Sequence, residues 1–103
     1  MDKIAALREI LAQEPANGFA RYGLAMELAS RGQLEDSLAE FNTLIAAQPD
    51  YTAAYFMAAQ TLANAGRRED AIARLKDGIV SANRTGNRHA LSEMQAMLDE
   101  LDR

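Results

Sequence analysis

The chain has 103 residues, a length that suits one domain with a hydrophobic core of its own. The formal net charge of −4 argues against nucleic acid as a partner, because binding to phosphates requires a basic surface. There is no cysteine and no apolar run of about 18 residues, so we expect no disulfide and no membrane span. The amino-terminal segment carries charges and does not resemble a secretory signal, which favours a cytoplasmic location.

Residues 2–13 predict an amphipathic helix, because apolar residues recur at helical spacing with charged residues opposite. Asp2 can cap the start of this helix, and Pro15 closes it. The apolar stripe consists of Ile4, Leu7, Ile10 and Leu11.

Residues 15–83 contain the same pattern twice, 34 residues apart. Gly32 recurs as Gly66, and Pro15 recurs as Pro49. A fixed period of this length is typical of arrays in which each unit buries its apolar face against its neighbours. We expect both glycines to adopt positive φ, because only glycine does so without steric cost. The pattern predicts four helices, at 18–31, 35–48, 52–65 and 69–84.

A final helix is predicted at 88–101, after the stop-and-turn signal of Thr85, Gly86 and Asn87. Its apolar spacing is shifted by about two residues from the 34-residue register. We therefore interpret residues 86–103 as a modified first helix that caps the array.

The two units resemble the tetratricopeptide repeat, a 34-residue helix-turn-helix with the skeleton W-x2-L-G-x2-Y, A-x3-F and P. The matching positions are Arg21, Leu24, Ala25, Leu28, Ser37, Phe41 and Pro49 in the first unit, and Tyr55, Ala58, Ala59, Leu62, Ala71 and Leu75 in the second. The departures from the skeleton are Arg21, Leu44 and Asn83, which replace a large apolar residue, a small residue and a proline.

The resemblance implies an all-α fold of about six helices, arranged as antiparallel hairpins that stack into a right-handed superhelix. We expect residues 1–103 to form a single domain of this family. Its predicted parts are a half repeat at 1–15, repeats at 18–51 and 52–85, and a capping helix at 86–103.

The resemblance also implies that first helices line a concave groove for a peptide or a helix of another protein. The groove residues that it places here are Phe19, Tyr22, Met26, Phe56, Met57 and Gln60. Some members hold a carboxylate with a Lys, Asn, Asn, Lys, Arg set, and this chain has Tyr22, Met26, Met57, Asn87 and Leu91 at the matching places. We therefore expect apolar rather than electrostatic binding.

We interpret the chain as an interaction module that docks an apolar helix or peptide of an unidentified protein. Two alternatives stay open: the last helix covers the groove, or two copies bury their grooves against each other as a homodimer with a structural or assembly role. We expect no enzyme activity, cofactor or metal, because His89 is the only histidine and has only Glu93 beside it at i+4.

Overall fold

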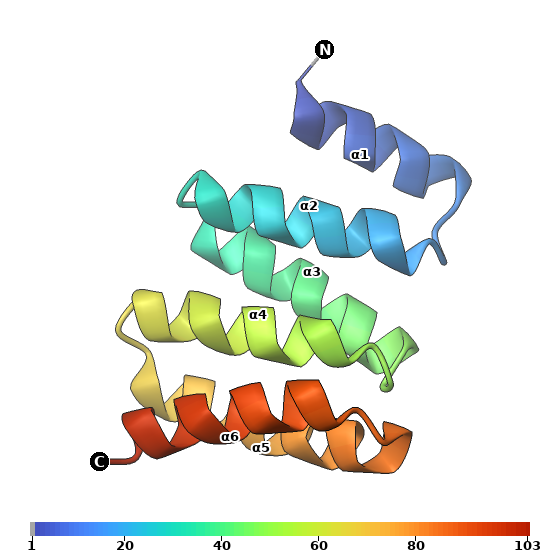
Figure 1. Ribbon diagram of the computed structural model, residues 1–103. Helices are drawn as coiled ribbons and strands as arrows, with labels where there is room; N and C mark the ends of the chain where they lie inside the picture. The colour runs from blue at the N-terminus through green and yellow to red at the C-terminus, as the bar shows by residue number, and fades with distance from the viewer. Residues whose placement is uncertain (1) are drawn as a thin grey trace. The chain divides into compact units, whose positions relative to one another are not determined.

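The computed structural model describes residues 2–103, and six α-helices make up its regular structure (Figure 1). Within these residues there is no β-strand. The all-α prediction is confirmed, and each helix boundary lies within one residue of the predicted one. The helices are α1 (Lys3–Gln13), α2 (Gly18–Ser30), α3 (Leu34–Ala47), α4 (Thr52–Asn64), α5 (Arg68–Thr85) and α6 (Arg88–Leu101).

The helices form two compact units, one ending at Gln48 and one beginning at Pro49. In the first unit, α2 packs against both α1 and α3. Its small residue Ala25 is fully buried, and the Ser37 hydroxyl donates a 2.7 Å hydrogen bond to the Ala25 carbonyl. These small side chains permit the close approach of α2 and α3 that the sequence predicts. The core beneath α1 consists of Ile4, Leu11, Ala20, Leu24 and Leu28, with Leu7 packed against it.

Arg21 stands where the repeat usually has a large apolar residue, and its contacts explain the exchange. Its guanidinium lies 2.6 Å from Glu40 Oε1 on α3 and donates a 3.1 Å hydrogen bond to the Pro15 carbonyl. In the second unit, the Tyr55 hydroxyl donates a 2.6 Å hydrogen bond to the Pro49 carbonyl. Arg21 and Tyr55 are 34 residues apart, so different side chains perform the same anchoring in the two units.

An ionic network joins the start of α1 to the end of α2. Arg31 lies 2.7 Å from Asp2 Oδ1 and 3.0 Å from Glu27 Oε2, and Lys3 lies 3.4 Å from Glu27 Oε1. Asp2 occupies the N-cap position of α1 but makes no side-chain capping hydrogen bond. The expected capping role is therefore wrong, because the Asp2 carboxylate pairs with Arg31 instead.

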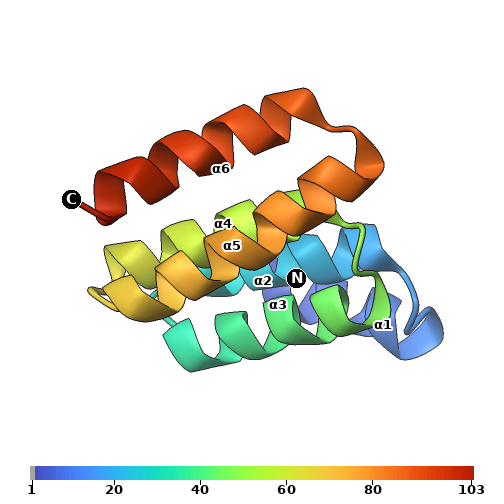
Figure 2. The same cartoon turned by 90° about the horizontal axis from the view of Figure 1, so that it is seen from below.

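In the second unit, α5 packs against α4 and α6, and α6 also contacts α4 (Figure 2). Met94 is the only fully buried residue of α6 and reaches Gly78 on α5. Buried polar atoms are paired here, since the hydroxyls of Thr52 and Ser81 lie 3.2 Å apart. The other large buried side chains of this unit are Tyr55, Leu62 and Leu75.

The turn between the first and second helix of each hairpin contains a glycine at positive φ, as predicted. φ is 76° at Gly32 and 79° at Gly66. The amides of Gln33 and Arg67, which follow these glycines, donate hydrogen bonds of 2.9 Å to the carbonyls of Leu28 and Leu62. Each bond satisfies a carbonyl at the end of a helix, which is the usual purpose of a glycine at this position.

α5 is longer than α3 because Asn83 replaces the proline that would end it. The helix continues to Thr85 and stops at Gly86, whose φ is 69°. The amide of Asn87 closes the turn with a 2.9 Å hydrogen bond to the Ala82 carbonyl. These additional residues account for the two-residue shift of α6 from the repeat register.

Candidate functional site

Three of the predicted groove residues lie along one side of α2 in the first unit. Phe19, Tyr22 and Met26 are separated by one and two turns, so a helix presents them together. The Phe19 side chain is 81% exposed, whereas Tyr22 and Met26 are half-buried. The Tyr22 ring meets Phe41 of α3 edge to face, with 6.3 Å between the ring centroids. Contact with α3 therefore fixes the Tyr22 ring while part of its surface remains accessible.

The other three predicted residues lie on α4 in the second unit. Phe56 and Met57 are half-buried, and Gln60 is exposed. All three keep accessible surface although α6 packs against α4. A second unfilled surface for a partner is therefore present on α4, with two large apolar side chains and one amide.

The charged groups near these faces are engaged elsewhere. Arg21, beside Tyr22, is paired with Glu40. In the second unit, the Arg84 guanidinium donates a 2.7 Å hydrogen bond to Asp50. Burial raises the pKa of the Tyr55 hydroxyl, which donates to the Pro49 carbonyl and is neutral at pH 7. The surfaces on α2 and α4 consequently offer apolar contact rather than fixed charge.

Asn87 belongs to the set that matches the carboxylate-binding residues of some relatives, but its side chain has a structural task. Its Oδ1 atom accepts a 3.0 Å hydrogen bond from the Ala90 amide at the start of α6. Asn17 does the same for α2, with 2.9 Å to the Ala20 amide. Asn87 is thus a helix cap, equivalent to Asn17.

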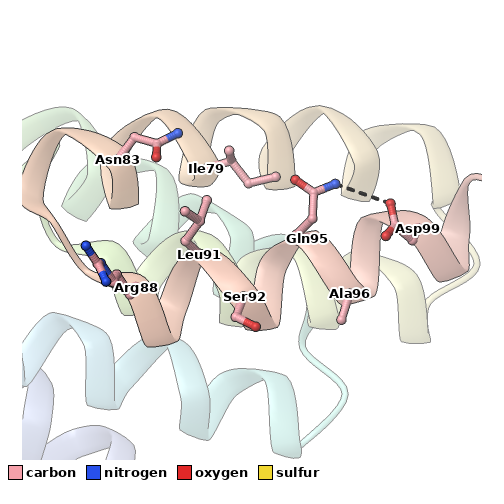
Figure 3. A pocket seen from close by; sticks show the side chains of 8 residues that line it. All are labelled: Ile79, Asn83, Arg88, Leu91, Ser92, Gln95, Ala96 and Asp99. Carbon is pink, nitrogen blue, oxygen red and sulfur yellow. Dashed lines mark hydrogen bonds between the residues drawn. The ribbon is translucent and has the colours of Figure 1, made fainter.

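One feature that the sequence prediction missed is an open depression between α5 and α6. Its volume is about 740 Å³, and most of the lining side chains come from α6 (Figure 3). Gln95 and Asp99 are joined there by a 3.2 Å hydrogen bond. The sequence signal for this surface was the run of polar residues on α6 at positions that are small and buried in α2 and α4. The lining residues are Ile79, Asn83, Arg88, Leu91, Ser92, Gln95, Ala96 and Asp99.

The other groups considered in the sequence form local pairs. His89 Nε2 lies 3.2 Å from Glu93 Oε1 on the exposed surface of α6, and His89 is 87% exposed. Arg67 pairs with Asp70 in the first turn of α5. Across residues 2–103, no group of three or more histidine, aspartate or glutamate side chains is placed to hold a metal ion. In the same residues, no helix is both long enough and apolar enough to span a bilayer.

Comparisons with known proteins agree with the helix pattern. Residues 28–98 match a family model described as tetratricopeptide repeat. The solution structure of a tetratricopeptide repeat domain protein from Salinibacter ruber is 31% identical, with a TM-score of 0.79 over 84% of this chain and 88% of that one. A crystal structure from the same organism gives 30% identity and a TM-score of 0.75, over 84% and 97% of the two chains.

A solution structure of a protein from Bordetella parapertussis is 25% identical to this chain. The TM-score is 0.84, and the alignment covers all of this chain and 90% of that one. No match is found among proteins with curated descriptions.

Proposed function

The chain belongs to the tetratricopeptide repeat family, and on that premise we propose that it is an adaptor that docks an apolar helix or peptide of another protein. The contact would use Phe19, Tyr22 and Met26 of α2 together with Phe56, Met57 and Gln60 of α4. The observation that carries this proposal is the 81% exposure of Phe19, which continues along α2 into the accessible surfaces of Tyr22 and Met26. An aromatic ring so exposed is typical of a surface that another molecule covers.

The chemistry of these faces supports binding rather than catalysis. Aromatic and methionine side chains adapt to differently shaped apolar partners. The described residues bring no nucleophile and base together at these positions, and a single-domain adaptor in the cytoplasm remains our prediction for the chain. Binding energy in such contacts concentrates in a few buried aromatic anchors, so Tyr22 and Phe56 should contribute most.

The proposal is tested by an affinity pull-down with the tagged protein and the double variant Tyr22→Ala, Phe56→Ala. Partners that are retained by the wild type and lost by the double variant would identify the ligand and the site together. The matched control is Glu35→Ala, Lys76→Ala, since both residues are exposed on second helices. Equal retention by wild type, control and double variant would refute the proposed site, provided that all three melt at similar temperatures.

A further inference from the structure

α6 leaves open the helix face that α2 buries under α3. The asparagine caps of α2 and α6 allow the two helices to be aligned residue by residue. In that alignment, the face of α6 that lines the open depression matches the face of α2 that contacts α3. The matched positions are Arg88, Leu91, Ser92 and Gln95 for Gly18, Arg21, Tyr22 and Ala25.

In the first unit, α3 covers this face through contacts of several kinds. The Gln48 side chain lies against Gly18, where an added Cβ would be 2.6 Å from Gln48 Nε2. The remaining contacts are the 2.6 Å ion pair of Glu40 with Arg21, the ring contact of Phe41 with Tyr22 and the 2.7 Å hydrogen bond from Ser37 to Ala25. They show what a helix must present in order to cover the equivalent face of α6.

α1 is a helix of the same kind as α3, with the corresponding face uncovered. Pro15 follows α1 as Pro49 follows α3, 34 residues later. α1 directs Ile4 and Leu11 into the core beneath α2, while Ile10 remains 40% exposed. The face of α1 that matches the contact face of α3 consists of Lys3, Ala6, Leu7, Ile10 and Glu14, for Ser37, Glu40, Phe41, Leu44 and Gln48. Leu44 is 1% exposed, so α1 leaves accessible an apolar position that α3 buries.

We propose that α6 of one molecule pairs with α1 of a second copy, as α2 pairs with α3 within one molecule. Charge complementarity favours this occupant. Glu14 takes the place of Gln48 and Arg88 the place of Gly18, so unlike charges would meet where those two residues touch. Lys3 would lie opposite Gln95, one turn from the Asp99 carboxylate. Each copy carries both halves of the contact, and Ile10 would be buried against α6.

The contact is heterologous, because it joins two different surfaces of identical molecules. Such contacts produce either closed rings or open chains, and the association grows with protein concentration. It goes beyond the adaptor proposal and uses none of the residues on the α2 and α4 faces. Each of the two proposals can therefore fail without the other.

The test is sedimentation velocity of the wild type and of two charge reversals over a range of concentrations at low salt. Arg88→Glu and Glu14→Arg should each weaken self-association about three- to tenfold, since each converts an exposed attraction into a repulsion. An equimolar mixture of the two variants should regain wild-type association. Each variant keeps the wild-type residue at the other position, so every mixed junction again joins unlike charges. The double variant Arg88→Glu, Glu14→Arg should also associate like the wild type.

Two further variants separate this contact from other modes. Ile10→Glu should reduce association about tenfold or more, because it places a charge at the centre of the contact. Phe19→Glu should leave association unchanged, whereas a dimer formed through the α2 face would be lost. Circular dichroism melting confirms that each variant is folded. A wild type that remains monomeric up to about millimolar concentration, or a mixture of charge reversals that fails to associate, would overturn the proposal.

Discussion

Gly78 is the residue at which the second unit is packed most closely. A Cβ atom added there would lie 2.5 Å from Met94 Sδ and 2.6 Å from Tyr55 Cβ. We predict that Gly78→Ala lowers the free energy of unfolding by about 1–3 kcal/mol, because the overpacking outweighs the gain in helix propensity. Urea denaturation monitored by circular dichroism measures the change.

Gly23 provides the matched control for Gly78, since it also lies inside a helix but has space around it. The nearest atom to an added Cβ is Leu7 Cδ2, at 3.6 Å. Gly23→Ala should therefore raise the free energy of unfolding by up to about 1 kcal/mol. If both substitutions stabilised the protein equally, the close contact of Gly78 with Tyr55 and Met94 would be contradicted.

Gly66 tests backbone strain without a packing effect. Its φ is 79°, and an added Cβ would meet no atom within 4 Å. Gly66→Ala, and more so Gly66→Val, should lower the free energy of unfolding by about 1 kcal/mol or more, because the left-handed conformation is unfavourable for residues with a Cβ. Thermal melting of the variant beside Gly23→Ala provides the measurement. An unchanged melting temperature would show that the turn accommodates other residues without strain.

At the scale of the element, α1 is attached to α2 through groups that titrate in acid. Hydrogen bonding to Arg31 holds the pKa values of Asp2 and Glu27 below their ordinary values. A carboxyl whose pKa is lower in the folded state stabilises the fold above its unfolded pKa, and that stabilisation is lost as the pH falls through the folded pKa. The attachment of α1 should therefore weaken as the pH falls below about 4.3, the ordinary pKa of a glutamate.

The measurement is the pH dependence of NMR chemical shifts for α1 residues, compared with those of α5. Arg31→Gln is the control, because it removes the partner of both carboxylates. In this variant α1 should be less ordered at neutral pH and should change less on acidification. If α1 and α5 lost structure together, with the same pH dependence in the variant, the network would not be the cause.

The hairpins themselves follow from local sequence, as the six helix boundaries show. Proline, glycine and capping asparagine act on their own segment of chain, so their effects can be predicted from neighbouring residues. The end of α5 illustrates this point from the opposite direction. With Asn83 in place of proline, the helix continues to Thr85, and α6 is displaced from the repeat register.

At the scale of the whole molecule, the prediction concerns how a partner binds. The proposed docking residues carry no formal charge, so affinity for a partner should change less than about threefold between low and high salt. Phe56→Ala should weaken binding more than Arg67→Ala, because Arg67 lies in an exposed ion pair with Asp70. Isothermal titration with an identified partner tests both statements. A tenfold or larger loss of affinity at high salt would instead indicate an electrostatic surface.

The candidate docking residues could be selected from the sequence only by their position in the repeat. Phe19 and Met26 can be placed on one side of a helix by spacing alone, because helix geometry is regular. Their exposed fractions could not be predicted, since exposure depends on what the neighbouring helices cover. Tyr22 is the clearest example: spacing assigns it to the surface, and contact with Phe41 makes it half-buried.

The sequence by itself determined the repeat period, the helices and the two turn glycines, because each depends on residues close together in the chain. Only the tertiary structure decided which distant side chains meet. It gave Arg21 its partner Glu40, drew Asp2 away from capping α1 to Arg31, and left the outer face of α6 uncovered. The physical reason is that ion pairs and burial are set by distances between helices, and helical spacing within one segment contains no information about those distances.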